Sequence, residues 1–159
     1  MNVISLIPMV GLGLFVLYVL YSSERYRARG IQALAIRSGM HYLGDALPKS
    51  LTLEGTPFSR ISKVWNVIDG EPRGTRIMAF DCRVGVGKGS WRRTVVAVEG
   101  IDKVLGPLSQ PDMTIDRSGR WMILYRPKAY FNLRIAGLTP LEELEAALKP
   151  FVADRHHKA

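Results

Sequence analysis

An apolar run at the amino terminus constrains this chain more than any other feature. The stretch from Val3 to Tyr21 holds no charged side chain, and Arg25, Arg27 and Arg29 follow soon after it. A helix of this length almost crosses a hydrocarbon core of about 30 Å, and polar flanks that reach toward the interface make up the shortfall. The sequence therefore predicts one transmembrane helix with a basic extension.

A cleaved signal peptide is the competing interpretation of the same run. Signal peptides carry positive charge before the apolar stretch and a small-residue cleavage site after it. Here Met1 and Asn2 precede the run, and Tyr21, Ser22 and Ser23 lie at its end. These flanks favour an uncleaved anchor.

Two glycines inside the apolar run, Gly11 and Gly13, are places where another membrane helix can approach closely. The run has no Gly-x-x-x-Gly pair, which is the stronger signal for helix association. A lone lipid-facing anchor and a helix docked on integral membrane proteins therefore stay open as equal alternatives.

The distribution of basic residues around the run predicts its orientation. None precedes it, whereas three arginines follow it closely. The positive-inside rule then places the amino terminus outside and the larger carboxy-terminal part in the cytoplasm. Cys82 is the only cysteine, so no intramolecular disulfide can form. We expect a single-pass protein of a bacterial inner membrane.

The chain after the apolar run is strongly basic. The formal net charge is +8, and every charged side chain follows Ser23. Anionic lipid, nucleic acid or an acidic protein surface would each suit such a charge. A domain already anchored at an anionic leaflet gains roughly 1 kcal/mol per basic residue near the surface. Because no nucleic-acid-binding signature is present, membrane apposition is favoured over nucleic acid binding.

Residues 22–38 are expected to continue the membrane helix, because good helix formers fill them. Gly39 is placed to end this helix in the left-handed conformation. Arg25 and Arg29 share one face, which we expect to lie on lipid head groups, and Gly30 is a candidate hinge. The predicted apolar stripe consists of Tyr26, Ile31, Leu34 and Ala35.

Runs of apolar and β-branched residues between turn residues predict an antiparallel sheet. The clearest pattern starts at Ile61 and is followed by runs over Thr75–Arg83 and Trp91–Glu99. A further hairpin is predicted between Met113 and Tyr125. Met40–Gly55 is expected to be a connector with one strand at most, so the sheet should have about five strands.

The carboxy-terminal segment predicts a helix from Pro140 to about Val152. Thr139 and Glu142 have the spacing of a capping box around a proline at the first helical position. One face of this helix is apolar, so it should cover the sheet. That face consists of Leu141, Leu144, Leu148 and Phe151.

The predicted fold class is α+β, with an N-terminal transmembrane helix, an antiparallel sheet and a C-terminal amphipathic helix. We expect three segments: a membrane helix with its basic extension over residues 1–38, the sheet domain over residues 39–153, and a basic tail over residues 154–159.

The glycine-rich stretch from Val84 to Ser90 has some likeness to a phosphate-binding loop. Such a loop requires Gly-Lys followed by Ser or Thr and then a helix, whereas Gly89 follows Lys88 here and a strand is predicted next. Nucleotide binding is therefore not predicted. The stretch is interpreted as a basic hairpin that contacts lipid phosphate or an acidic partner, with a solvated turn as the alternative. Its basic residues are Arg83, Lys88, Arg92 and Arg93.

No pattern predicts a catalytic, cofactor or metal site. Cys82 lies in an apolar strand without a nearby His-Asp arrangement, which favours a packing role over a nucleophile. His156 and His157 are adjacent and cannot by themselves close a metal site, and His41 is distant in sequence. The tryptophans are expected in the core rather than in an exposed aromatic patch. They are Trp65, Trp91 and Trp121.

The order of an anchor, a basic helix, Asn66–Gly70, Ala79–Arg83, a Gly-Lys-rich tip and Thr94–Val96 resembles a group of uncharacterised bacterial single-pass membrane proteins with a small cytoplasmic α+β domain. The resemblance covers roughly residues 20–135. At the position of Cys82 that group more often has an aromatic residue. The resemblance implies no catalytic residues.

Two functions of different classes fit these observations. The favoured one is a non-catalytic accessory or scaffolding subunit of a larger inner-membrane complex, of respiratory, photosynthetic or transport type. The alternative is a lipid head-group-binding module resembling a pleckstrin-homology-like barrel. Neither is an enzyme, and both have anionic lipid as a partner, with integral membrane proteins added in the first. The predicted contact residues are Gly11, Gly13, Arg25, Arg27, Arg29, Arg83, Lys88, Arg92 and Arg93.

Overall fold

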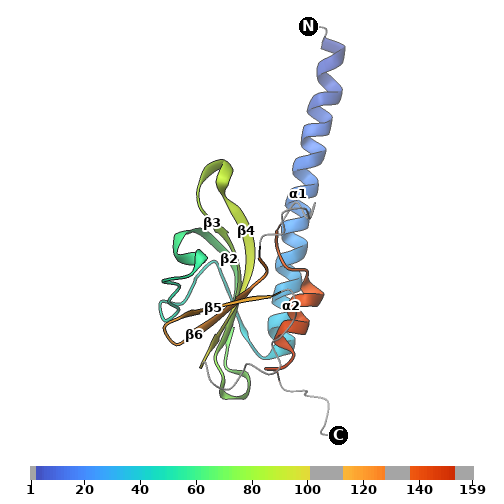
Figure 1. Cartoon of the computed structure of the whole chain (residues 1–159). Helices are drawn as coiled ribbons and strands as arrows, with labels where there is room; N and C mark the ends of the chain where they lie inside the picture. Colours follow the sequence, from blue (N-terminus) through green and yellow to red (C-terminus); the bar gives the residue numbers. More distant parts are fainter. Residues whose placement is uncertain (1–2, 101–112, 128–136, 153–159) are drawn as a thin grey trace, which may run out of the picture. The chain divides into compact units, whose positions relative to one another are not determined.

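The computed structural model describes residues 3–100, 113–127 and 137–152, without the side chains of residues 3–9 and 20. It is an α+β structure with a six-stranded antiparallel sheet (Figure 1). The chain divides into two compact units, Met1–Gly30 and Ile31–Ala159.

Helix α1 (Val3–Ser38) spans both units, so its last turns, from Ile31 onward, belong to the second unit. Helix α2 (Leu141–Leu148) lies near the carboxy terminus. The sheet order is β1-β2-β3-β4-β6-β5, and every neighbouring pair is antiparallel. The strands are β1 (His41–Gly44), β2 (Ile61–Gly70), β3 (Ile77–Val84), β4 (Trp91–Glu99), β5 (Thr114–Ser118) and β6 (Trp121–Tyr125).

Helix α1 ends as its sequence predicts. Gly39 has a φ of 68°, and its backbone N–H donates to the carbonyl oxygen of Ile36 over 3.3 Å. The N–H of Met40 donates to the carbonyl oxygen of Ala35 over 2.9 Å. These two bonds form a Schellman motif, and Met40 and Ala35 lie in the same hydrophobic cluster.

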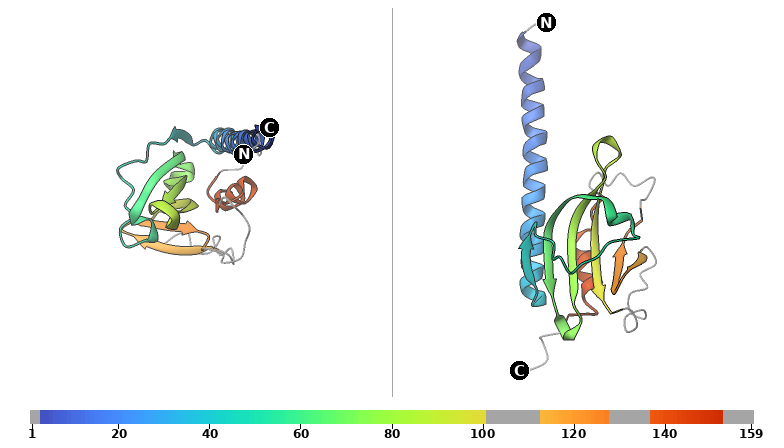
Figure 2. Two further views of the ribbon diagram at one scale, coloured as in Figure 1. Left: turned by 90° about the horizontal axis from the view of Figure 1, so that it is seen from above. Right: turned by 90° about the vertical axis from the view of Figure 1, so that its left-hand side faces the viewer.

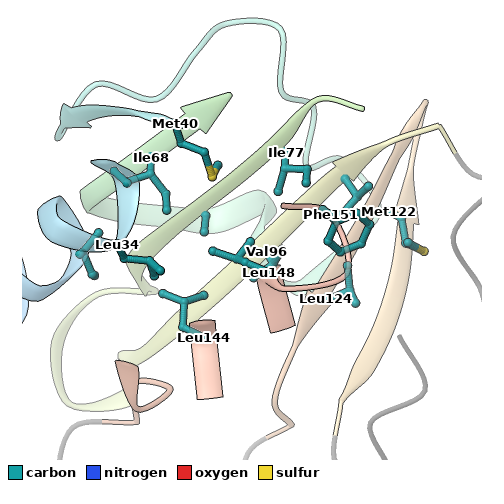
Figure 3. Packing of buried hydrophobic residues seen from close by; sticks show 14 residues of the cluster. Leu34, Met40, Ile68, Ile77, Val96, Met122, Leu124, Leu144, Leu148 and Phe151 are labelled. Atoms are coloured by element: carbon teal, nitrogen blue, oxygen red, sulfur yellow. The ribbon is translucent and has the colours of Figure 1, made fainter. Parts of the chain in front are cut away.

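A first core lies between the helical segments and one face of the sheet. Helix α2 and the end of α1 lie on the same side of the sheet (Figure 2). Of the predicted helical stripe, Ile31, Leu34 and Ala35 are buried here, whereas Tyr26 is 77% exposed. Figure 3 shows the packing. The buried cluster includes Leu34, Met40, Ile68, Ile77, Val96, Met122, Leu124, Leu144, Leu148 and Phe151.

A second core fills the opposite face, which the sequence did not predict. The sheet is strongly bent, and the β1–β2 connection crosses its inner side (Figure 2). The indole N–H of Trp121 donates to the carbonyl oxygen of Ser50 over 3.0 Å, and the Ser118 hydroxyl donates to that of Glu54 over 2.8 Å. The buried members are Leu51, Phe58, Val67, Met78, Phe80, Cys82, Val84, Val95, Ala97, Trp121, Ile123 and Tyr125.

The predicted capping box at the last helix is wrong. Helix α2 begins at Leu141 and ends at Leu148, and the cap residue Pro140 makes no side-chain cap bond. The backbone N–H of Thr139 instead donates to the Thr94 hydroxyl over 3.0 Å, which ties this segment to β4. The apolar face of the helix is nevertheless buried as predicted, because Leu144 is 1% exposed in the first core.

The membrane assignment receives no support from the described part of the chain. No helix there combines the length and the apolar character that a membrane crossing requires. The transmembrane helix within residues 1–38 therefore stays a prediction from the sequence. The predicted tail, residues 154–159, lies outside the described residues.

Candidate functional site

The β3–β4 hairpin is the best-defined candidate for a contact surface. It extends beyond the rest of the sheet in Figure 1. The two strands pair without interruption from Ile77 and Val98 to Val84 and Trp91. A short 3-10 turn, η3 (Gly87–Gly89), lies in the connecting loop and leads into a strand. The loop therefore lacks the helix that a phosphate-binding loop requires.

Three basic side chains form a row across the outer half of this hairpin and its neighbour β2. Arg83 is the cross-strand partner of Arg92 on β4 and of Lys63 on β2. Directly paired residues project from the same face of a sheet. Like charges in such positions repel each other, and the row concentrates positive charge on this part of the sheet.

A tryptophan lies beside this row. The ammonium of Lys63 lies 5.9 Å, and the guanidinium of Arg92 5.6 Å, from the ring centroid of Trp65. Cation–π contacts of this kind hold the two charges near the aromatic face. Trp65 is partly buried and Lys63 is exposed. The outer half of the sheet thus presents positive charge next to an amphipathic ring.

Arg93 does not belong to this row, although it was predicted with the others. Consecutive strand residues point to opposite faces, and Arg93 is only 8% exposed. Its guanidinium donates to the carbonyl oxygens of Arg92 over 2.6 Å and Gly137 over 3.4 Å, and lies 5.0 Å from the Trp91 ring. Burial lowers the pKa of Arg93. These contacts bind the Arg93 side chain to the backbone of Arg92 and Gly137 and to the Trp91 ring.

A buried polar ladder crosses four strands, and the sequence reasoning missed it. Asp81 is 0% exposed and accepts hydrogen bonds from the Thr94 hydroxyl over 2.7 Å and the Asn66 amide over 3.0 Å. The Tyr42 hydroxyl donates to the Asn66 carbonyl oxygen over 3.1 Å. Thr139 joins through its bond to Thr94. This ladder connects β1 to β4 at the base of the hairpin.

Asn66 supplies the local geometry for the ladder. It has a φ of 55°, which is uncommon outside glycine, and it lies where the β2–β3 register shifts between Trp65 and Ile68. The sequence feature that could have predicted this ladder is a polar residue within an otherwise apolar run. It occurs at Asn66 and again at Asp81. The hydrogen bonds between Tyr42, Asn66, Asp81 and Thr94 connect neighbouring strands, so the ladder supports their register.

The predicted anchor residues lie in the first unit. A Cβ added at Gly11 or Gly13 would meet no atom within 4 Å, so nothing described occupies the space beside them. The guanidinium of Arg25 lies 4.5 Å from the Tyr21 ring centroid. Arg29 is exposed. The remaining residue of this basic cluster is Arg27, which is partly buried.

The prediction that Cys82 is a packing residue is confirmed. It is 0% exposed in the second core, and burial raises its pKa to about 12. Trp121 is also fully buried, as predicted, while Trp65 and Trp91 are only partly buried. Among the residues that the structure describes, no three His, Cys, Asp or Glu side chains are grouped to hold a metal ion.

Comparison with protein-family models, curated proteins and solved structures gave no match to this chain. The resemblance to single-pass membrane proteins therefore stays an expectation from the sequence.

Proposed function

We propose that this protein is a membrane-anchored, non-catalytic accessory or scaffolding subunit of a larger inner-membrane complex, of respiratory, photosynthetic or transport type. The observation that carries the proposal is the series of exposed apolar side chains on the first unit. Leu12 is 64% exposed, and Leu14, Phe15 and Leu17 are each 63% exposed. Burying one such side chain is worth about 1.5–3 kcal/mol, so together they favour an apolar solvent.

The distribution of basic residues supports the same membrane location and indicates the orientation of the chain in the membrane. Arg25, Arg27 and Arg29 follow the apolar run, and no basic residue precedes it. An anionic cytoplasmic leaflet attracts basic residues beside a membrane helix. The sheet domain would then lie on the cytoplasmic side of a bacterial inner membrane.

In this proposal the protein acts by holding its partners in position. The open space beside Gly11 and Gly13 would allow a helix of an integral membrane partner to approach the backbone closely. The second unit has a packed core on each face of its sheet, which suits a rigid domain that presents a surface.

Extraction of the full-length chain from its native membrane in mild detergent tests this function. The extract is separated on a sizing column, and the peak is examined by mass spectrometry. We expect migration with a defined set of integral membrane proteins in a fixed ratio. The double variant Gly11→Leu, Gly13→Leu should lose these partners but stay in the membrane. Ala33→Leu, an exposed helical position in the second unit, is the control. Migration as an isolated monomer would contradict the proposal.

A lipid head-group-binding module is the second candidate. The basic row of Lys63, Arg83 and Arg92 favours it, because phosphate groups suit clustered cations. Charge reversal of Arg83 and Lys88 separates the two functions. Loss of lipid binding with the assembly intact would favour the module, whereas loss of co-purifying partners would favour the accessory subunit.

A further inference from the structure

The tip of the β3–β4 hairpin exposes an apolar residue among cations. Val86 is 88% exposed, and its neighbours Gly85 and Gly87 have φ values of 78° and 70°, which favour glycine. Lys88 follows and is exposed. In a membrane interface an exposed valine would leave water, while cations beside it would meet anionic head groups.

The structure fixes this exposure at the base of the loop. The backbone N–H of Gly85 donates to the carbonyl oxygen of Arg60 over 3.1 Å, and the Ser62 hydroxyl donates to the carbonyl oxygen of Gly85 over 2.8 Å. Within the loop, the N–H of Ser90 donates to the carbonyl oxygen of Gly87 over 3.1 Å. The loop is therefore bound to β2 and to the residue before it, while the Val86 side chain is exposed.

The β3–β4 hairpin differs in charge from other parts of the sheet, where arginines pair with carboxylates. At the end away from the hairpin, Arg76 pairs with Asp69 over 2.9 Å and Arg120 pairs with Glu99 over 3.0 Å. In the hairpin, residues 82–98 contain no acidic residue. The basic row and Lys88 therefore give this end a positive potential that complements an anionic surface.

We propose that the β3–β4 hairpin is a second membrane contact, in which Val86 enters the head-group region of an anionic leaflet while Lys63, Arg83 and Lys88 bind lipid phosphates. The inference rests on the proposed membrane anchoring of the same chain. An acidic protein would satisfy the cations, but the exposed valine at the tip favours lipid. Trp65, beside the row, has the amphipathic character of interfacial aromatic residues.

A fluorescent label at the tip tests the contact. The full-length variant Val86→Cys is labelled with a polarity-sensitive thiol dye and reconstituted into nanodiscs. One set contains phosphatidylcholine alone, and the other contains phosphatidylcholine mixed with phosphatidylglycerol. The buried native Cys82 should stay unlabelled, which the parent chain checks directly. The same dye on Ile115→Cys, an exposed position on edge strand β5, is the matched control.

We expect the emission from position 86 to shift to the blue only in the anionic nanodiscs, and to return toward its value in water at high salt. Each cation near the leaflet strengthens the contact about fivefold, so Arg83→Gln with Lys88→Gln should weaken it about 25-fold. Position 115 should not respond to lipid composition.

The experiment distinguishes a failure of the membrane anchor from a failure of the hairpin contact. A chain that does not enter either nanodisc contradicts the anchor, and the hairpin inference fails with it. A chain that enters both but keeps aqueous emission at position 86 overturns the hairpin inference alone. If the Gln variants keep their lipid signal but lose a co-purifying protein, the cations serve an acidic partner and the inference is overturned.

Discussion

The two units of this protein differ in the exposure of their apolar side chains. In the first unit, consecutive positions such as Leu14 and Phe15 are each 63% exposed. In the second unit, both faces of one sheet are covered, so that Ile68 on one face and Val67 on the other are each 0% exposed. The second unit therefore covers its own apolar side chains, whereas the first unit leaves its apolar side chains exposed.

The largest expected effect comes from a cavity in the second core. Ile123→Ala removes a 0% exposed side chain from the middle of β6 and should lower the free energy of unfolding by about 2–5 kcal/mol. Leu17→Ala is the matched change in the first unit and should leave the unfolding of the sheet domain unchanged. Thermal unfolding followed by near-ultraviolet circular dichroism in detergent measures both. Equal effects of the two variants would contradict this difference between the two units.

A charge in the first unit should have the next largest effect. Leu14→Arg places a cation in the apolar run, at a cost of about 2.5–3.5 kcal/mol for a position near the centre of a membrane helix. We expect the chain to leave the membrane pellet during alkaline carbonate extraction. Ile36→Arg, at a position of the same helix that is 76% exposed in the second unit, should stay in the pellet. Retention of both variants would argue against lipid around the first unit.

The closed interior of the second unit also predicts a pH dependence. Burial is the main cause that raises the pKa of Cys82 from 9.0 and of Tyr125 from 10.0, each to about 12. The unfolded chain therefore loses these protons first as the pH rises, so the free energy of unfolding should fall between about pH 9 and 12.

The double variant Cys82→Ala, Tyr125→Phe should flatten this decline, because it removes both groups. Urea denaturation at a series of alkaline pH values measures the slope. An unchanged slope in the double variant would show that other groups govern the alkaline transition.

Glycine substitutions in the two units should have the smallest effects on unfolding. Gly39→Ala puts a side chain at a φ of 68°, which should cost about 1 kcal/mol and lower the melting temperature by a few degrees. Gly11→Ala adds a methyl group with no atom within 4 Å and should not change the unfolding of the sheet domain. Thermal denaturation of both variants checks this. A larger loss at Gly11 would mean that the first unit has neighbours of its own.

Local patterns predicted the elements better than they predicted the contacts between them. The run Trp91–Glu99 has the bounds of β4, and the predicted strand Thr75–Arg83 differs from β3 by only a few residues at its ends. Gly39 ends α1 because a left-handed residue suits glycine wherever the helix packs. These features depend on a few neighbouring residues, so the sequence contains their signal.

Long-range contacts explain what the sequence did not show. The second core requires the β1–β2 connection to cross the inner face of the sheet, which no local pattern encodes. Thr139 was expected to cap α2, but its backbone binds Thr94 on a distant strand. Arg93 is adjacent to Arg92 in sequence, yet strand alternation directs it to the other face. The candidate contact surface consequently lost Arg93 and gained Lys63, Trp65 and Val86.

Spin labels test directly whether the first unit lies in lipid, as we propose. Spin labels at Leu14→Cys and Ile36→Cys in membrane-reconstituted protein compare the two units directly, through their collision rates with oxygen and with a water-soluble nickel complex. We predict that the label at position 14 meets mainly oxygen, while the label at position 36 meets mainly the nickel complex. Equal access of the nickel complex to both positions would contradict the account.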